Sequence, residues 1–245
     1  MPPSRRDDLV NAAVDVFYRH GFHKTNIDQV LEVGGISRMT LYNHFESKEA
    51  LVVAALRQRD EQFRELMLKG ADEAIDRYEG ALARAVEARA KGGENGAVGL
   101  ESVMDCEGGE CGADEWVREM SLGRRKGVWR IIGLFDFHCG WFEEEQFSGC
   151  MFINASAAYE DAGCEVRGVA SEHKRTVVRF LRNQCEEAGL RNPSRLSEQL
   201  NILLDGAIVA AQVEGQVSGN EIGMGDSGEW AKRAALVLMR EAARD

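Results

Sequence analysis

Apolar residues recur at helical spacing along most of this chain. The first example is a stripe at positions i, i+3, i+4, i+7 and i+8, formed by Leu9, Ala12, Ala13, Val16 and Phe17. This spacing places the five side chains on one face of a helix that we expect at about residues 5–20. No segment alternates apolar and polar residues in the way that a half-buried strand does. The pattern therefore predicts an all-α protein.

Residues 25–48 contain a shorter pattern of helix caps and glycines. Asn26 can cap a helix, because its side-chain oxygen accepts a hydrogen bond from a free backbone N–H. Gly34 and Gly35 can end that helix, since glycine adopts the left-handed conformation without a steric penalty. Ser37 can then cap the next helix. These residues predict two short helices that are joined by a glycine turn.

The second of these helices differs from an ordinary solvent-exposed helix. Leu41 and Phe45 lie four positions apart and are expected to point inward. The side chains that remain outside are those of Arg38, Met39, Thr40, Tyr42, Asn43 and His44. This face presents hydrogen-bonding groups instead of a run of solvated charges, as the second helix of a DNA-binding helix-turn-helix does.

A family resemblance becomes specific at the same residues. Residues 36–51 read Ile-Ser-Arg-Met-Thr-Leu-Tyr-Asn-His-Phe-Glu-Ser-Lys-Glu-Ala-Leu, which resembles the signature of the tetracycline-repressor (TetR) family of bacterial transcription regulators. The preceding Phe17…His20-Gly-Phe-His-Lys-Thr25 fits the same signature. The resemblance implies a helix-turn-helix DNA-binding domain at residues 1–48 and a ligand-binding and dimerisation domain at residues 49–245. A fourth helix, at about residues 47–68, would connect the two.

The candidate DNA contacts follow partly from chemistry and partly from this resemblance. Arg38 can fork onto guanine or grip phosphate, and Met39 and Thr40 can touch thymine methyl groups. The resemblance implies phosphate contacts by Tyr42, His44 and Lys48. Lys48 would act at the N-terminus of the fourth helix, and Asn26 would assist at the N-terminus of the second helix. The full candidate set is Asn26, Ser37, Arg38, Met39, Thr40, Tyr42, Asn43, His44 and Lys48. The alternative is an ordinary solvated helix face.

Composition and charge limit the functions that this chain can have. The 245 residues are 44% hydrophobic and 29% charged, which is typical of a globular protein of one or two domains. No apolar run approaches membrane-spanning length and no signal peptide begins the chain, so we expect a cytoplasmic protein. Residues 1–60 contain eight basic and eight acidic residues, so the other 22 basic and 33 acidic residues carry the whole net charge of −11. A neutral DNA-binding domain must rely on a few well-placed contacts in a dimer.

The middle of the chain departs from the family layout. We expect a separate helix at about residues 71–90 and then a glycine-rich insertion, looped or disordered, at about residues 91–127. Cys106 and Cys111 in this insertion make a thiol- or redox-sensing regulator one alternative function. The remaining cysteines, Cys139, Cys150, Cys164 and Cys185, are expected to behave as small buried hydrophobes. We predict no catalytic residues, no metal site and no cofactor.

Two histidines are candidates for an effector pocket. His138 and His173 each lie on an apolar helical stripe, so both should point inward. A buried histidine needs a hydrogen-bond partner, which a carbonyl, Asp205 or a bound ligand would supply. The candidate pocket consists of His138, Trp141, Phe152, Asn154 and His173. The alternative is an ordinary core histidine at each position.

The last part of the chain contains the candidate dimer interface. A helix at about residues 194–216 is apolar on two sides, and a helix at about residues 229–243 can lie beside it. The resemblance implies that this pair meets its two-fold mate as a four-helix bundle. The exposed apolar side chains that a partner would cover are Ile202, Val209, Val213, Trp230 and Val237.

These features predict a ligand-responsive transcriptional regulator. It would act as a repressor, bind a palindromic operator in double-stranded DNA as a homodimer, and be released by a small-molecule effector. One alternative is a helical protein-interaction adaptor that has lost specific DNA binding. The absence of net charge in the N-terminal domain would be consistent with it. An enzyme is a third class, for which no catalytic constellation stands out.

Overall fold

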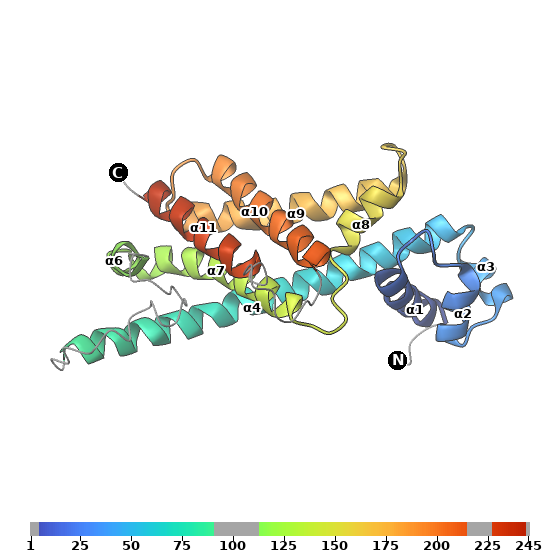
Figure 1. Ribbon diagram of the computed structural model, residues 1–245, viewed down its shortest axis with the longest axis horizontal. Coiled ribbons are helices and arrows are strands. Elements are labelled where there is room, and N and C mark those ends of the chain that lie inside the picture. The colour runs from blue at the N-terminus through green and yellow to red at the C-terminus, as the bar shows by residue number, and fades with distance from the viewer. Residues whose placement is uncertain (1–4, 91–112, 215–226, 244–245) are drawn as a thin grey trace. The chain divides into compact units, whose positions relative to one another are not determined.

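The described residues of the computed structural model are 5–90, 113–214 and 227–243, and all their regular elements are α-helices (Figure 1). The elements are α1 (Arg5–His20), α2 (Ile27–Gly34), α3 (Arg38–His44), α4 (Lys48–Ala90), α6 (Ala113–Arg118), α7 (Leu122–Phe142), α8 (Met151–Ala158), α9 (Glu165–Glu187), α10 (Pro193–Glu214) and α11 (Ser227–Ala243). The predicted all-α class is confirmed. Across these described ranges, no helix combines the length and the apolar character needed to cross a bilayer.

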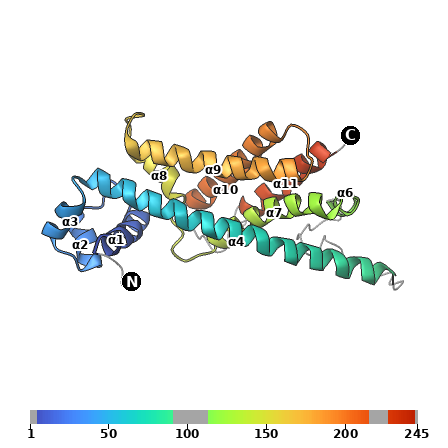
Figure 2. The same cartoon turned by 180° about the vertical axis from the view of Figure 1, so that it is seen from behind.

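The chain divides into two compact units. The first consists of Met1–Glu65 and Glu145–Thr176, and the second of Leu66–Glu144 and Val177–Asp245. Helices α4 and α9 contribute residues to both units. Within the first unit, α8 and the beginning of α9 run beside the first part of α4 in both views (Figures 1 and 2).

The core of the first unit begins with the predicted apolar stripe of α1. The five stripe residues are all buried: Leu9, Ala12, Ala13, Val16 and Phe17. The ring of Phe17 stacks on that of Phe22, with their centroids 5.5 Å apart. The next residue in α1 is Tyr18, whose hydroxyl accepts a hydrogen bond of 3.1 Å from the backbone N–H of Ser148. Helix α1 is therefore held on both sides within this unit.

A single helix, α4, occupies the segment for which the sequence predicted two helices. The predicted gap between about residues 68 and 71 contains one glycine, Gly70. A glycine inside a helix costs only about 1 kcal/mol relative to alanine. Gly70 also lies against α7, because a Cβ added there would be 3.8 Å from the Cβ of Phe137. Packing of this kind offsets the glycine penalty, so the helix continues.

Part of the predicted insertion is ordered as helix. Residues 91–112 lie outside the described residues, whereas α6 and the first turns of α7 fall in the remainder, up to residue 127. Val117 and Met120 are buried there. Helix α7 starts at Leu122, inside the range that was predicted as the insertion. Its start was missed because the first turn of α7 is rich in basic residues and glycine rather than apolar residues.

Helices α4 and α7 approach each other closely in the second unit. A Cβ added to Gly133 would lie only 2.5 Å from the Cβ of Ala74 and 3.1 Å from the carbonyl oxygen of Gly70. One helical turn away, the rings of Tyr78 and Trp129 stack with their centroids 5.0 Å apart. The absence of a side chain at Gly133 thus allows two helix backbones to come close enough for the flanking aromatic rings to pack.

Helices α10 and α11 pack against each other, and both pack against α7. The inner face of α10 consists of the buried side chains of Leu196, Leu200, Leu204, Ala207 and Ile208. Leu203 is half-buried. The described boundaries of α10 and α11 agree with the predicted helices to within two residues.

The α4–α7 approach makes a prediction about stability. Gly133→Ala should lower the free energy of unfolding by about 1–3 kcal/mol, because the new methyl group has no room beside Ala74. Gly140→Ala is the matched control on the same helix, since a Cβ there would meet nothing within 4 Å. The control should be neutral or stabilising by up to ~1 kcal/mol through helix propensity. Urea titration followed by circular dichroism measures both, and equal stability of the two variants would contradict the close approach.

Candidate DNA interface

Helices α2 and α3 are held by the caps that the sequence predicts. The Asn26 side chain accepts a hydrogen bond of 2.9 Å from the N–H of Gln29, and the Gln29 side chain accepts one of 2.8 Å from the N–H of Asn26. Gly35 ends α2 in the left-handed conformation, with φ of 60°. Ser37 Oγ then accepts from the N–H of Thr40 at 3.1 Å. These local bonds set the geometry of the turn between the helices.

The inward face of α2 and α3 is apolar. Leu41 and Phe45 are buried, as predicted, and so are Val30 and Leu31 of α2. Both helices pack against α1 as well as against each other. Because one face of the seven-residue α3 is fully used in packing, its other face is held toward solvent.

The predicted DNA-facing side chains lie on that outer face. Met39 is 74% exposed and Tyr42 is 58% exposed, which is unusual for residues with large apolar parts. The side chains of Arg38, Asn43 and His44 are also exposed. Thr40 is half-buried, and its hydroxyl lies 2.9 Å from that of Ser37. The outer face of α3 therefore carries a cation, a thioether, a phenol, an amide and an imidazole within reach of one ligand.

Arg38 forms an ion pair within this face. Its Nη2 donates a hydrogen bond to Oδ1 of Asp28, which lies in the first turn of α2. The hydrogen bond and the charge of Asp28 raise the pKa of Arg38 above its usual value. Both side chains remain largely exposed, at 60% and 65% of their surface. The sequence did not predict this pair, because its members are ten residues apart on different helices.

Lys48 has a structural contact that the sequence did not predict. Its ammonium nitrogen donates to the backbone carbonyls of Phe22 and Thr25, each at 2.6 Å. These bonds join the start of α4 to the turn before α2. Burial lowers the pKa of Lys48. An ammonium group has three N–H donors, so a phosphate contact by Lys48 stays a prediction that uses the third.

Comparison with known proteins agrees with this geometry. The sequence model of "Bacterial regulatory proteins, tetR family" matches residues 9–55, which comprise most of α1, all of α2 and α3, and the start of α4. The HTH-type transcriptional regulator RutR of Escherichia coli (strain K12) is 42% identical over 55 residues, 22% of this chain and 26% of RutR. UidR of the same strain is 40% identical over 57 residues, 23% of this chain and 29% of UidR. Residues 9–55 are a TetR-family domain.

The matched region spans less than a third of the length of these curated relatives. For the rest of the chain, the comparison is with solved structures. The crystal structure of SCO4454, a TetR-family transcriptional regulator from Streptomyces coelicolor, superposes with a TM-score of 0.65 and 19% sequence identity. The superposition covers 98% of this chain and 96% of SCO4454. At that identity the likeness shows the fold alone. The helices that follow residue 55 therefore share the fold of the SCO4454 chain.

The predicted effector pocket divides between the two compact units. In the first unit, the rings of Phe152 and His173 stack with centroids 3.6 Å apart. Nδ1 of the buried His173 lies 2.7 Å from Oδ1 of Asp60 on α4. Asn154 donates to the carbonyl of Ser148 at 3.0 Å, which holds the start of α8. These three predicted residues are thus brought into one unit.

The other two predicted pocket residues belong to the second unit. Nδ1 of the buried His138 lies 2.7 Å from the carbonyl oxygen of Leu134, one turn earlier in α7. Its ring packs edge-on against Trp141 at 5.8 Å. This is the arrangement of a core histidine. Asp205, suggested as a histidine partner, accepts a hydrogen bond from Asn201 at 3.1 Å. A pocket common to both histidines stays a prediction.

His173 also lines an open groove within the first unit. The groove has a volume of about 640 Å³, which is in the range of small-molecule sites. Its charged lining residues are Arg57, Asp60, Glu61, Arg64, Glu165 and Glu172. Arg57 pairs with Glu165 at 2.7 Å, and Arg64 pairs with Asp60 at 3.2 Å. Such walls suit a polar ligand better than an apolar one.

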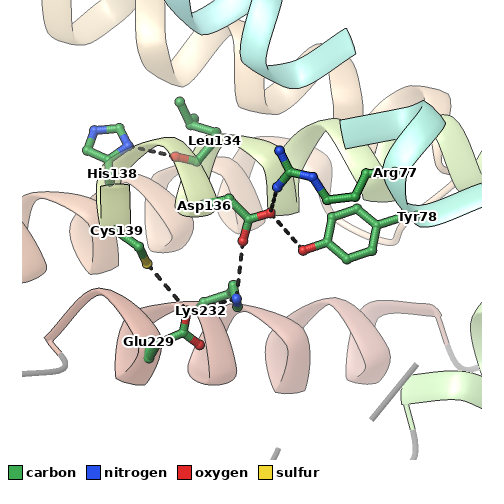
Figure 3. A network of polar contacts seen from close by, with 8 residues as sticks. All are labelled: Arg77, Tyr78, Leu134, Asp136, His138, Cys139, Glu229 and Lys232. Carbon is green, nitrogen blue, oxygen red and sulfur yellow. Dashed lines mark hydrogen bonds and ion pairs between the residues drawn. The ribbon is translucent and has the colours of Figure 1, made fainter. Parts of the chain in front are cut away.

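A buried polar network in the second unit was missed by the sequence analysis (Figure 3). Asp136 of α7 accepts a hydrogen bond of 2.7 Å from the hydroxyl of Tyr78 and one of 3.1 Å from Lys232 of α11. Lys232 also bonds Glu229 at 2.8 Å. Cys139 approaches the same oxygen of Glu229, with its Sγ at 3.6 Å. The network ties α4, α7 and α11 together.

One signal for this network is present in the sequence. Asp136 is the one charged residue in the mainly apolar run Ile131–Phe142, and a lone carboxylate on a buried stripe requires a charged partner. Lys232 meets that requirement in the structure and is itself only 5% exposed. Burial lowers its pKa, but the charges and hydrogen bonds of Asp136 and Glu229 raise it by more, so the net shift is upward.

The cysteines agree only in part with the prediction. Cys150 and Cys185 are buried as expected, whereas Cys139 and Cys164 are half-buried. Burial raises the pKa of the Cys139 and Cys185 thiols to about 12, which keeps both protonated and unreactive at neutral pH. The pair Cys106 and Cys111 lies outside the described residues. Where the structure describes the chain, no three His, Cys, Asp or Glu side chains gather closely enough to hold a metal ion.

The five side chains predicted to form a dimer interface are all exposed in the isolated chain. The exposed fractions are 68% for Ile202, 42% for Val209, 80% for Val213, 59% for Trp230 and 63% for Val237. They come from α10 and α11, the two helices that pack together. An exposed set of this size on two adjacent helices is typical of an interaction surface.

The His173–Asp60 pair predicts a pH-dependent contribution to stability. Burial raises the pKa of Asp60, but the hydrogen bond and charge of His173 and the charge of Arg64 lower it by more. A carboxyl whose pKa is lower in the folded state stabilises the protein above its unfolded pKa of about 3.9, and this contribution is lost as the pH falls below that. Asp60→Asn should therefore cost about 1 kcal/mol at pH 7 and progressively less below about pH 4. Glu61→Gln, which removes an exposed charge from the same helix, is the control.

Urea titrations of both variants at several pH values measure these differences. If the loss of unfolding free energy in Asp60→Asn did not become smaller at low pH, the Asp60–His173 ion pair would not be its cause.

Proposed function

We propose that this protein is a ligand-responsive transcriptional regulator that binds DNA through α2 and α3. It acts as a repressor, binds a palindromic operator as a homodimer, and leaves the operator when a small-molecule effector binds. The observation that carries the proposal is the outer face of α3. Its side chains can donate and accept hydrogen bonds and contact methyl groups, while capping and burial hold the helix in place.

The chemistry of each side chain suggests its role in DNA binding. Arg38 can donate two parallel hydrogen bonds to guanine, and Met39 can contact a thymine methyl group. Tyr42 and His44 are suited to phosphate oxygens, which position the protein without reading the bases. The N–H groups at the starts of α2 and α4 can bind two further phosphates.

A homodimer accounts for both the palindrome and the exposed apolar surface. Two copies of α3 must reach successive major grooves, about 34–36 Å apart, for both half-sites to be read. The α10–α11 surface gives an isologous interface, in which the same patch of each subunit is covered. Each large apolar side chain that is removed from water contributes roughly 1.5–3 kcal/mol to association.

The effector is proposed to bind near His173, in the groove that α4 and α9 line. The same α4 begins four residues after the last residue of α3, so a ligand that displaces it would move the DNA-binding helices. The operator affinity then falls by the difference between the effector affinities of the DNA-bound and DNA-free forms. A polar small molecule fits the charged lining of this groove.

Recovery and sequencing of genomic DNA bound to the purified protein test the proposal. A regulator should enrich fragments that share one palindromic sequence, and duplexes carrying that sequence should bind in proportion to the dimer concentration. Recovery of fragments without a shared sequence would favour the protein-interaction adaptor instead.

The roles assigned on α3 predict two different mutant behaviours. Arg38→Ala should weaken operator binding and relax the preference at one base pair, because a forked contact to guanine contributes about 1–3 kcal/mol of discrimination. Tyr42→Phe should weaken binding to operator and to random DNA by the same factor, since it removes one phosphate hydrogen bond. Titrations of both variants with both duplexes provide the comparison. Equal losses on the two duplexes for Arg38→Ala would assign Arg38 to the DNA backbone.

A charge on the α10–α11 surface should weaken DNA binding without unfolding the protein. Val209→Glu places a charge on the apolar surface and should yield helical monomers that bind the operator at least tenfold more weakly, a loss of ~1.4 kcal/mol or more. Val86→Glu is the matched control, because Val86 is 53% exposed on α4, outside the proposed interface. Analytical ultracentrifugation and circular dichroism measure association and folding. A Val209→Glu protein that sediments as a dimer would place the interface elsewhere.

A further inference from the structure

Asp28 is the one acidic side chain whose contact with the outer face of α3 the structure describes. It lies in the first turn of α2, where the partial positive charge of a helix N-terminus favours a carboxylate. Its carboxylate accepts a hydrogen bond from Nη2 of Arg38. Arg38 is the first residue of α3, where the same helix dipole disfavours a cation. The pair therefore offsets an electrostatic cost at the start of α3.

The geometry of the pair leaves Arg38 able to bind a base. A guanidinium group has five N–H donors in a rigid fork, and Nη2 carries two of them. The bond to Asp28 occupies one N–H of Nη2. The other N–H of Nη2 and one from Nη1 can donate in parallel to the two acceptors on the major-groove edge of a guanine. Asp28 can thus remain bonded while Arg38 reads a base.

We propose that Asp28 is a positioning residue that fixes the guanidinium of Arg38 for reading guanine, and that it thereby sets the sequence specificity of this protein. The proposal rests on the function proposed above. An arginine side chain loses rotamer entropy when it binds, and a partner that already restricts it reduces that loss at the correct site. A random-sequence duplex presents guanine at the required place only by chance, so there the carboxylate mainly competes with phosphate for the cation.

The structure offers a control for the simple effect of charge. Glu32 lies on the same short helix, four residues after Asp28, and is also exposed. Removing either carboxylate takes one negative charge away from the DNA-facing region, which should tighten binding to any DNA. Only the removal of Asp28 takes away the contact with Arg38. A difference between the two variants therefore isolates the positioning effect.

The test compares Asp28→Asn with Glu32→Gln in the full-length protein. Each is titrated with a duplex carrying the palindrome enriched from genomic DNA and with a random-sequence duplex of equal length. Glu32→Gln should tighten binding to both duplexes by the same factor. Asp28→Asn should tighten binding to random DNA but lower the ratio of operator to random affinity by roughly two- to fivefold, which is the range measured for exposed charge pairs. Circular dichroism of both variants checks that the domain remains folded.

The same substitution in an Arg38→Ala background completes a double-mutant cycle. If Asp28 acts through Arg38, Asp28→Asn should leave the affinity ratio of Arg38→Ala unchanged. A ratio that falls equally for Asp28→Asn and Glu32→Gln, or a loss that persists without Arg38, would overturn the proposal. A wild-type protein that prefers no sequence at all would instead overturn the function on which the proposal rests. A wild-type preference that Asp28→Asn leaves intact would overturn the positioning role alone.

Discussion

The proposed DNA contacts depend on a helix that is too short to be stable by itself. Helix α3 has seven residues, whereas isolated helices shorter than about 12–15 residues are marginal in water. Its existence in this chain rests on the Ser37 cap at one end and on the burial of Leu41 and Phe45 along one side. The same contacts that make it a helix also choose which side chains face outward. The contacts that stabilise α3 therefore also determine which side chains its outer face presents.

Because packing fixes which side chains α3 presents, a DNA-binding domain without net charge can rely on a few positioned cations. Two of its few cations are already engaged: Lys48 with two carbonyl oxygens and Arg38 with Asp28. Exposed ion pairs contribute only about 0–1 kcal/mol, so DNA can take over part of such a contact at little cost. A strongly basic surface would bind any DNA and require an equally strong discrimination between sequences. A neutral surface with a few positioned donors keeps non-specific binding weak and leaves the affinity to the correct bases.

The elements that depend on local chemistry were predictable from the sequence. The stripe of α1, the Asn26 and Ser37 caps and the left-handed Gly35 all follow from residues a few positions apart, and all were found. The pairs Asp28–Arg38, Asp60–His173 and Asp136–Lys232 were not predicted. Each joins residues on different helices, and the spacing of charges along the chain does not say which helices meet. The continuous α4 was missed for a related reason, because the cost of Gly70 is local while the packing that offsets it is not.

Helix α11 buries one charged side chain and exposes two large apolar ones. Its Lys232 is 5% exposed, whereas its Trp230 and Val237 are 59% and 63% exposed. Burying an ammonium group costs several kcal/mol unless anions surround it, and Asp136 and Glu229 do so here. The side chains that face inward beside Lys232 are otherwise small or apolar, since Ala231, Ala235, Leu236 and Met239 are buried. In the proposed dimer, a second copy of the chain covers the outer apolar side chains, while the ion pairs satisfy the ammonium group on the inner side. The exposed apolar face of α11 is therefore the physical argument for the proposed dimer.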